Sequence, residues 1–204
     1  GVILSENGPR MPDDSMNESA TMDVQIQHWK QSIGSIKSNL KNGTLRALVD
    51  KQSLNSPHLV EHLRAHDKIC SSQLGLLSSH VDNEKVLDCS SPNTLNDPVV
   101  KEWCEFISNQ YIAPKGLDNV LILLPCSARK PYRLSKSHGR FIRAINSNSC
   151  HEVMVTSPLG LVPRDLEEIW PASHYDIPVT GDWTNDELIR TQTMLDSLLA
   201  RHNY

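Results

Sequence analysis

The period of the hydrophobic positions changes near residue 115. Before that point, apolar residues recur at helical spacing, and turn or capping residues separate the segments. Asn42-Gly43 ends the first segment, and Ser56-Pro57 and Asp97-Pro98 each open a later one. The expected helices cover residues 24–40, 45–49, 57–69 and 98–111. We therefore expect residues 24–114 to be mostly helical.

After Pro114-Lys115-Gly116, short apolar runs alternate with helical stretches. The first run, Val120 to Leu124, is typical of a strand buried on both faces. Further strands are expected at 152–156 and 175–179, with a short one near 85–89, and helices at 135–145, 163–169 and 184–201. This order predicts a three-layer α/β/α fold with a short, mainly parallel sheet, preceded by a helical N-terminal segment. The ligand crevice of such a sheet lies at the carboxyl ends of its strands.

Domain organisation follows from the same pattern. Residues 1–23 are rich in Ser, Asn, Asp, Met and Pro and show no period, so we expect a flexible linker or arm. Residues 24–204 are expected to form a single domain, with a helical part at 24–114 and an α/β part at 115–204.

Composition narrows the class of protein. The 204 residues carry a net charge of −4, so no overall positive field attracts nucleic acid, and any such contact must be local. The longest apolar run is far shorter than the ~20 residues that span a bilayer, which predicts a cytoplasmic protein without membrane contact. Five cysteines without paired spacing predict free thiols.

A basic loop follows the first strand of the α/β part. Between Cys126 and Arg143 the chain has six Lys or Arg residues and no acid. At the start of a helix, such a loop suits a phosphate or a nucleotide, because the helix N-terminus adds partial positive charge. The alternative is a basic helix face that only meets solvent.

Cys126 is the candidate nucleophile of this loop. A thiol beside Arg129 and Lys130 is expected to have a lowered pKa, and His138 could provide acid–base catalysis. The alternative is a buried structural thiol, because free cysteine is among the most buried residue types.

A second loop, residues 157–164, follows the next strand. Its Gly160 allows close approach of a ligand, and Arg164 offers a donor fork for phosphate or carboxylate. The segment 165–187 then has seven acids, including Asp176, and no Lys or Arg. It could face the basic loop and bind a cationic amine beside phosphates, or pair with that loop structurally without a ligand.

A repeat of potential metal ligands lies in the helical part. His58, His62, His66 and Cys70 recur every four residues, and adjacent pairs at this spacing can chelate a metal. Four such positions spread over more than three turns, so we favour a polar helix face and expect no metal or cofactor.

The loop at Pro125–His138 resembles a known family. Its sequence, PCSARKPYRLSKSH, is similar to the motif of archaeosine synthase, an archaeal paralogue of tRNA-guanine transglycosylase. Segments 42–50 and 157–183 also look like that family's central domain. The motif positions are Pro125, Cys126, Lys130, Pro131, Tyr132, Ser135 and His138.

This resemblance implies a function in tRNA modification. Archaeosine synthase adds an amine, free lysine, to the nitrile of 7-cyano-7-deazaguanine in tRNA, and a radical SAM partner enzyme completes archaeosine. The family also implies a fold similar to uracil-DNA glycosylase. The chain lacks the family's transglycosylase-like barrel and C-terminal PUA domain, so we expect weak tRNA binding by these residues alone.

Residue chemistry suggests roles within that reaction. Cys126 would attack the nitrile, Lys130 would lower its pKa, and His138 would move protons. Ser135, the fourth expected catalytic residue, would orient the nitrile or the base. Asp176 could hold the ammonium group of lysine. The other expected substrate contacts are Pro125, Pro131, Tyr132, Ser157, Pro158 and Gly160, and the expected RNA contacts are Arg129, Arg133 and Lys136.

Two other functions compete with this one. The chain could be a non-catalytic module that binds tRNA or a partner enzyme, in which case the basic loop acts through charge alone. A glycosylase-like hydrolase is suggested only by the implied fold, which is weak support. No carboxylate that could activate water directly follows the first strand, where Pro125-Cys126-Ser127 stands.

Overall fold

The computed structural model describes residues 3–5, 8–11, 18–70, 84, 86–117, 119–146, 149–177 and 181–204. Contacts between residues divide the chain into two compact units, Gly1–His66 and Asp67–Tyr204. The sequence pattern instead suggested a boundary near residue 23. The division falls later because α1 (Glu18–Lys41) packs locally, against the N-terminal strands and the helix that follows it.

The first unit contains a short hairpin and helices. Strands β1 (Ile3–Ser5) and β2 (Gly8–Arg10) pair antiparallel beside α1. Helix α1 includes the expected helix at 24–40, begins earlier, and gives way to α2 (Leu45–Ser53) through Gly43, whose φ of +68° suits glycine. Helix α3 (Pro57–Ile69) begins at the predicted proline and ends in the second unit.

The second unit is built on a mixed sheet. Strands β4 (Leu121–Pro125) and β5 (His151–Thr156) run parallel, whereas β6 (Gly160–Pro163) pairs antiparallel with β5. The sheet is therefore not mainly parallel, and the expectation of a helix over 163–169 was wrong. Gly160 has a φ of +71°, which lets the chain reverse, and only the short turn η3 (Arg164–Leu166) follows β6.

A second strand pair is separate from that sheet. Strand β3 (Leu87–Asp88) runs parallel to β7 (Tyr175–Asp176), with Leu87 beside Tyr175. The predicted strand at 175–179 is thus shorter in the described residues, and its positions 178 and 179 lie outside them. The pairing brings the segments around residues 88 and 176 together.

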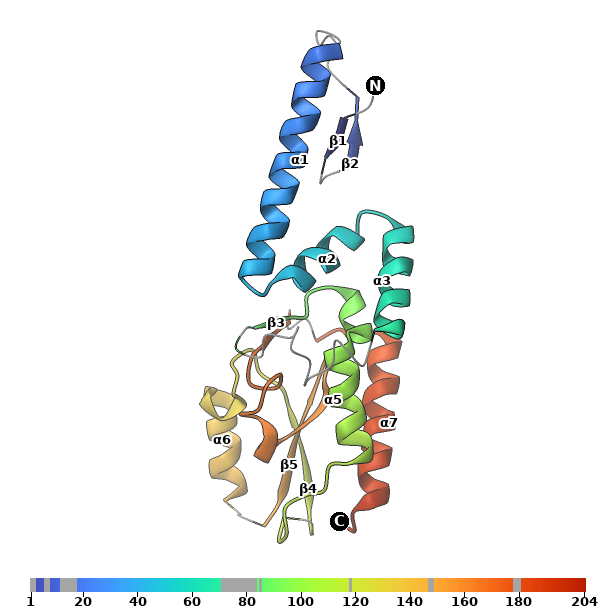
Figure 1. Ribbon diagram of the computed structural model, residues 1–204. Coiled ribbons are helices and arrows are strands. Elements are labelled where there is room, and N and C mark those ends of the chain that lie inside the picture. The colour runs from blue at the N-terminus through green and yellow to red at the C-terminus, as the bar shows by residue number, and fades with distance from the viewer. Residues whose placement is uncertain are drawn as a thin grey trace. The chain divides into compact units, whose positions relative to one another are not determined.

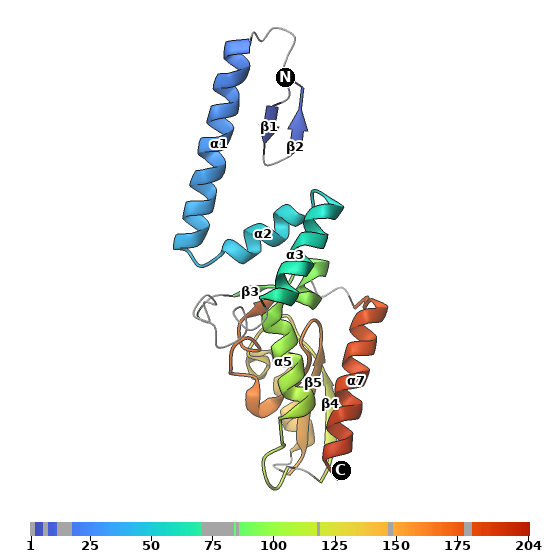
Figure 2. The same cartoon turned by 45° about the vertical axis from the view of Figure 1, so that its right-hand side comes forward.

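Helices flank both faces of the mixed sheet. In Figure 1, α6 (Lys136–Ile145) lies on one side of β4 and β5, and α5 (Pro98–Asn109) and α7 (Asn185–Arg201) lie on the other. Figure 2 brings α5 and α7 toward the viewer. Short turns η1 (Pro92–Asn96) and η2 (Tyr132–Leu134) precede α5 and α6. The described part of this unit is an α/β structure.

Apolar burial joins these layers. Val100 and Ile107 of α5 and Leu198 of α7 are fully buried, together with Val153 and Met154 of β5. The indole of Trp103 donates a hydrogen bond of 3.1 Å to the carbonyl of Leu161. Such a core accounts for the burial of β5 and β6, which alternate little between polar and apolar residues.

Strand β4 differs from its sequence-based expectation. Among the described residues it pairs only with β5, so it forms an edge of the sheet. Leu124 is buried, but Leu123 is 44% exposed, and the prediction of a strand buried on both faces was wrong. A continuous apolar run specifies hydrophobic surroundings without specifying how many neighbouring strands supply them.

The start of α7 agrees with the sequence. Thr184 caps the helix, and the Glu187 carboxylate accepts a hydrogen bond from the Thr184 backbone N–H, which completes the predicted capping box. Burial raises the pKa of Glu187, but hydrogen bonds from Ser157 and Thr184 outweigh burial and lower it overall. The carboxylate is therefore held in its charged form.

A buried polar cluster lies at the amino end of β5. The Tyr111 hydroxyl donates to Asp165 at 2.8 Å, so it must accept from His151 Nε2 at 2.9 Å. His151 Nδ1 accepts in turn from the Tyr204 hydroxyl. This neutral imidazole is only 1% exposed, and burial lowers its pKa to about 4. The cluster joins the segment directly after α5, strand β5, the turn at Asp165 and the last residues of the chain.

Two further findings concern the whole described chain. No helix in the described residues is long and apolar enough to cross a bilayer. All five cysteines, each a described residue, are free thiols, which confirms that prediction.

The close approach at Gly160 gives a first testable prediction. A Cβ at this position would lie 2.3 Å from Met194 Sδ, in a core where Met194 is 2% exposed. Gly160→Ala should therefore lower the free energy of unfolding by about 2–4 kcal/mol, from overpacking together with the positive φ. Chemical denaturation of the purified chain measures this change.

Gly181→Ala is the matched control for backbone strain. Gly181 has a similar φ of +74°, but a Cβ there meets nothing within 4 Å. We expect it to cost only about 1 kcal/mol. Equal losses for the two variants would show that contact with Met194 contributes nothing.

His151 gives a second prediction, for the pH dependence of stability. Unfolded histidine binds a proton with a pKa near 6.5, whereas folded His151 resists protonation down to about pH 4. The unfolded chain therefore binds more protons in this window, and stability falls as the pH falls. The contribution of His151 amounts to about 3 kcal/mol between pH 7 and pH 4.

Denaturation of wild type and His151→Gln between pH 4 and 7 measures that contribution. The glutamine amide can still donate and accept hydrogen bonds but does not titrate, so the variant should lose stability less steeply as the pH falls. Burial also lowers the pKa of His138, so part of the slope should remain. Identical slopes would contradict the assignment to His151.

Candidate functional site

The basic loop connects β4 to α6, as the sequence predicted. Ser135 caps α6, because its hydroxyl accepts a hydrogen bond of 3.1 Å from the His138 backbone. The same hydroxyl lies 3.1 Å from the Ser137 hydroxyl. Ser135 therefore fixes where the loop ends and the helix begins.

His138 connects the two ends of this loop. A guanidinium only donates hydrogen bonds, so His138 Nδ1 accepts from Arg164 at 3.0 Å. Its Nε2 then carries the proton and donates to the Pro125 carbonyl at 3.0 Å. Burial, and secondarily the charge of Arg164, lowers the pKa of His138. Both nitrogens of this neutral ring hold the loop, and its service as a proton carrier stays a prediction.

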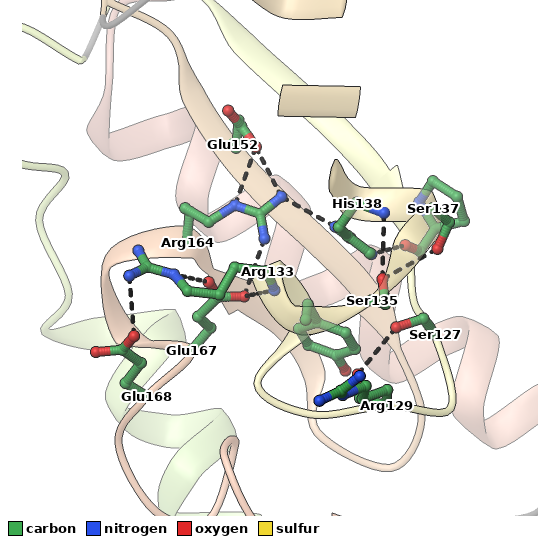
Figure 3. A network of polar contacts seen from close by, with 12 residues as sticks. Ser127, Arg129, Arg133, Ser135, Ser137, His138, Glu152, Arg164, Glu167 and Glu168 are labelled. Carbon is green, nitrogen blue, oxygen red and sulfur yellow. Dashed lines mark hydrogen bonds and ion pairs between the residues drawn. The ribbon is translucent and has the colours of Figure 1, made fainter. Parts of the chain in front are cut away.

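Arg164 is the centre of a network of charged groups (Figure 3). Its guanidinium bonds Glu152 Oε2 at 2.7 and 3.0 Å and Glu167 Oε2 at 2.9 Å, besides His138. The side chain of Glu167 is fully buried, and that of Arg164 is 15% exposed. The sequence suggested that the Arg164 guanidinium would bind a phosphate or carboxylate of a ligand. In the structure its nitrogens instead bond to side chains of the protein itself.

Arg133 joins the same network. Glu167 accepts from the Arg133 backbone at 3.1 Å and from its Nε at 2.8 Å, and Glu168 pairs with the guanidinium at 2.9 Å. The acidic segment and the basic loop thus pair structurally at this point, as one alternative held. The other expected RNA contacts of the loop, Arg129 and Lys136, are exposed.

A chain of buried hydroxyl groups lies beneath the loop. Tyr132 is fully buried, and its hydroxyl is hydrogen-bonded to that of Tyr175. The Tyr175 hydroxyl oxygen also lies 2.6 Å from Thr156 Oγ1. Burial raises the pKa of Tyr132 to about 12 and that of Tyr175 well above its usual value. Both phenols therefore stay neutral at ordinary pH. They connect the basic loop, β7 and the end of β5.

Lys130 lies over the face of Tyr175. Its ammonium nitrogen is 3.9 Å from the centre of the ring, a cation–π arrangement. Burial lowers the pKa of Lys130, whereas attraction by Asp176 and by the thiols of Cys126 and Cys89 opposes that effect. Lys130, Cys126 and Asp176 therefore share one electrostatic environment, and their expected roles stay predictions.

The second loop is held by α7. Ser157 is buried and donates a hydrogen bond to Glu187, and the Pro158 carbonyl accepts from Arg190 at 3.4 Å. Met194 faces the position where Gly160 lacks a side chain. These residues build the wall behind the loop, and direct substrate contact by Ser157, Pro158 and Gly160 stays a prediction.

Sequence reasoning missed several members of this site. Tyr175, Thr156 and Cys89 are separated widely from the motif along the chain and reach it only through β7, β5 and the pairing of β3 with β7. Glu167 was only one of seven acids in its segment. An aromatic residue at the start of the expected strand at 175 was the available signal, because aromatic faces attract cations.

The described residues contain no group of three or more His, Cys, Asp or Glu side chains arranged to hold a metal. His58 of α3 lies 4.0 Å from Glu61, and both side chains are highly exposed. The helix therefore presents at least this part of the histidine repeat to solvent.

A family model described as "Domain of unknown function (DUF5591)" matches residues 100–204, which include β4, α6 and all of the site's loops. The chain belongs to this family.

Curated relatives give the family a biochemical context. The archaeosine synthase subunit alpha of Thermoplasma acidophilum is 39% identical over 178 residues, which cover 83% of this chain. The archaeosine synthase of Haloferax volcanii is 31% identical over 195 residues, or 96% of the chain. A tRNA-guanine(15) transglycosylase of Methanobrevibacter smithii is 28% identical over 196 residues, or 87% of the chain. The resemblance to archaeosine synthase is thereby confirmed.

The chain spans about a third of the length of these relatives, 32%, 32% and 28% respectively. No solved structure matches it. Similarity to uracil-DNA glycosylase therefore stays a prediction.

The buried network gives a third testable prediction. Glu167→Gln would place an amide nitrogen among the donors of Arg133 and Arg164 and leave buried positive charge uncompensated. We expect a loss of about 3 kcal/mol in the free energy of unfolding.

Glu168→Gln is the matched control, because Glu168 pairs with the same Arg133 but its side chain is 60% exposed. This variant should change stability by less than about 0.5 kcal/mol. Thermal or chemical denaturation of both variants compares them, and similar losses would show that burial of Glu167 is unimportant.

Proposed function

We propose that this chain performs amine addition to a nitrile in tRNA, the step of archaeosine biosynthesis in which lysine joins 7-cyano-7-deazaguanine. The observation that best supports this proposal is the grouping of Cys126, Lys130 and Asp176 beside the motif's buried tyrosines. The names of its curated relatives agree with a function in tRNA modification. Because its substrate is tRNA, the proposal puts the protein in the cytoplasm.

The reaction has a covalent first step. The Cys126 thiolate attacks the nitrile carbon, a carbon–sulfur bond forms, and one π bond of the nitrile breaks as its nitrogen takes a proton. The product is a thioimidate. The lysine amine then attacks the same carbon, gives up a proton, and the thiolate leaves. Atoms balance between nitrile plus amine and amidine, and neither a cofactor nor a metal is needed.

Lys130 and Asp176 have complementary tasks in this scheme. Lys130 places a positive charge in the same electrostatic environment as Cys126, and the face of Tyr175 keeps its ammonium group in place. Asp176 is exposed, so its carboxylate can also attract the ammonium group of an incoming lysine. Tyr132 and Ser135 fix the loop against which the base rests.

His138 differs from the other motif residues. It can move a proton only if its bond to Pro125 or to Arg164 opens, because both ring nitrogens are occupied. We propose that its first task is to hold Pro125 and hence the adjoining Cys126. We propose that the radical SAM enzyme that completes archaeosine catalyses the next step, on the product of this reaction.

A non-catalytic module for binding tRNA or a partner is the second candidate function. The exposed Arg129 and Lys136 favour it, because within the described part of the chain no ion pair neutralises their charge. Under this alternative, replacing the Cys126 thiol changes nothing, whereas removing positive charge weakens binding and its salt dependence.

Trapping of the covalent intermediate is a fourth prediction. Wild-type chain incubated with free 7-cyano-7-deazaguanine should gain the mass of one nucleobase, because addition to a nitrile expels no group. Peptide mass spectrometry should place the added mass on Cys126. Cys126→Ser should lose the adduct, whereas Cys150→Ser should keep it, since Cys150 is a free, half-buried thiol outside the loop.

Turnover is measured separately with tRNA that contains the nitrile base and with isotopically labelled lysine. A lysine adduct that survives in Cys126→Ser would replace the covalent step with direct attack by the amine. If neither adduct forms while tRNA still binds, the binding module becomes the better function.

A further inference from the structure

One exposed face of α6 is basic. Lys136, Arg140 and Arg143 are exposed, and their spacing places them within one side of the helix. His138, Phe141 and Ile145 lie on the opposite side, where they pack toward the core. The three cations therefore point away from the sheet.

These charges are not neutralised within the described protein. No side-chain hydrogen bond or ion pair joins Lys136, Arg140 or Arg143 to another described residue. The guanidinium of Arg133, in the loop before α6, instead forms ion pairs with Glu167 and Glu168. No acid occurs from residue 126 to 146, although the chain has a net charge of −4. The face thus keeps a local positive field in an acidic protein.

A glycine on this face has no structural explanation. Gly139 lies in the interior of α6, where glycine is less stable than alanine. A Cβ there would meet only Arg143 Nη1, at 3.9 Å, an ordinary contact. The fold therefore has room for alanine. A glycine that packing does not require is expected where another backbone must approach closely.

We propose that the face of α6 formed by Lys136, Gly139, Arg140 and Arg143 binds the phosphodiester backbone of RNA. Arginine forks match phosphate oxygens, and the missing side chain at Gly139 lets a sugar–phosphate strand lie against the helix. The choice of RNA as the polyanion rests on the proposed function. The proposal replaces Arg133 as an RNA contact with Arg140 and Arg143.

The test measures binding of the 204-residue chain to an unmodified tRNA transcript by fluorescence anisotropy over a range of salt concentrations. This transcript lacks the nitrile base, so the result is independent of the amine-transfer chemistry. Arg140→Gln combined with Arg143→Gln should weaken binding about tenfold at low salt and reduce the salt slope by about 1–2.

Lys101→Gln combined with Lys115→Gln is the matched control for net charge. Lys101 lies on α5, across the sheet from α6, and Lys115 is in the loop before β4 (Figure 1). This double variant should keep wild-type affinity within about twofold, because its charges lie off the proposed face. If it weakens binding as much as the α6 variant, the face has no special role and the proposal is overturned.

Gly139→Ala adds a readout that simple damage to the fold cannot produce. It should raise the melting temperature by about 1–4 °C, because alanine favours the helix, and yet weaken tRNA binding. Unchanged affinity in both Gly139→Ala and the α6 double variant would overturn the proposal. So would loss of binding to vesicles of anionic phospholipid in the α6 variant with unchanged binding to tRNA, since the face would then serve lipid.

The two proposals fail in different ways. If amine transfer is never observed but the α6 variant loses tRNA binding, the RNA face stands and the catalytic function falls. If transfer occurs and the α6 variant binds tRNA normally, only the RNA face falls.

Discussion

The need to compensate a largely buried guanidinium organises the second unit of this protein. Arg164 could not stay charged away from water without nearby carboxylates, and Glu152 and Glu167 supply them from a strand and from the turn after β6. Arg133 adds a second positive charge against Glu167. Arg164 also fixes the tautomer of His138, so this group of charged side chains sets the position of the loop between β4 and α6.

Hydrogen bonds along that loop hold the segment that carries the half-buried thiol of Cys126 and the side chain of Lys130. Ser135 fixes the end of the loop, Tyr132 fixes its middle, and the carbonyl of Pro125 is held by His138. The residues of the motif therefore have two kinds of role. Most of its residues build the support, and Cys126 and Lys130 are the two that the proposed reaction uses directly. Preorganisation of this kind lowers the cost of aligning the reacting groups.

The local part of this arrangement was predictable from sequence. The helix start at Pro57, the capping box at Thr184 and the loop between β4 and α6 depend on neighbouring residues, and the structure contains all three. The antiparallel strand β6 and the edge position of β4 depend on which strands pair, which a hydrophobic run does not specify. Residue types alone likewise did not single out Glu167, because it lies in a segment with many acids. Its partners Arg133 and Arg164 are 34 and 3 residues away along the chain.

The buried hydroxyl groups also have a direction. Thr156 donates to the Ser157 carbonyl at 3.3 Å, so it accepts from Tyr175, which in turn accepts from Tyr132. The three dipoles point the same way, from the first loop to the second, and each polarises the next. Reversing one hydroxyl would oblige its neighbours to turn as well. The two loops on either side of the site are thereby coupled through aligned dipoles, and a polar group that binds near Tyr132 would change the field felt at Ser157.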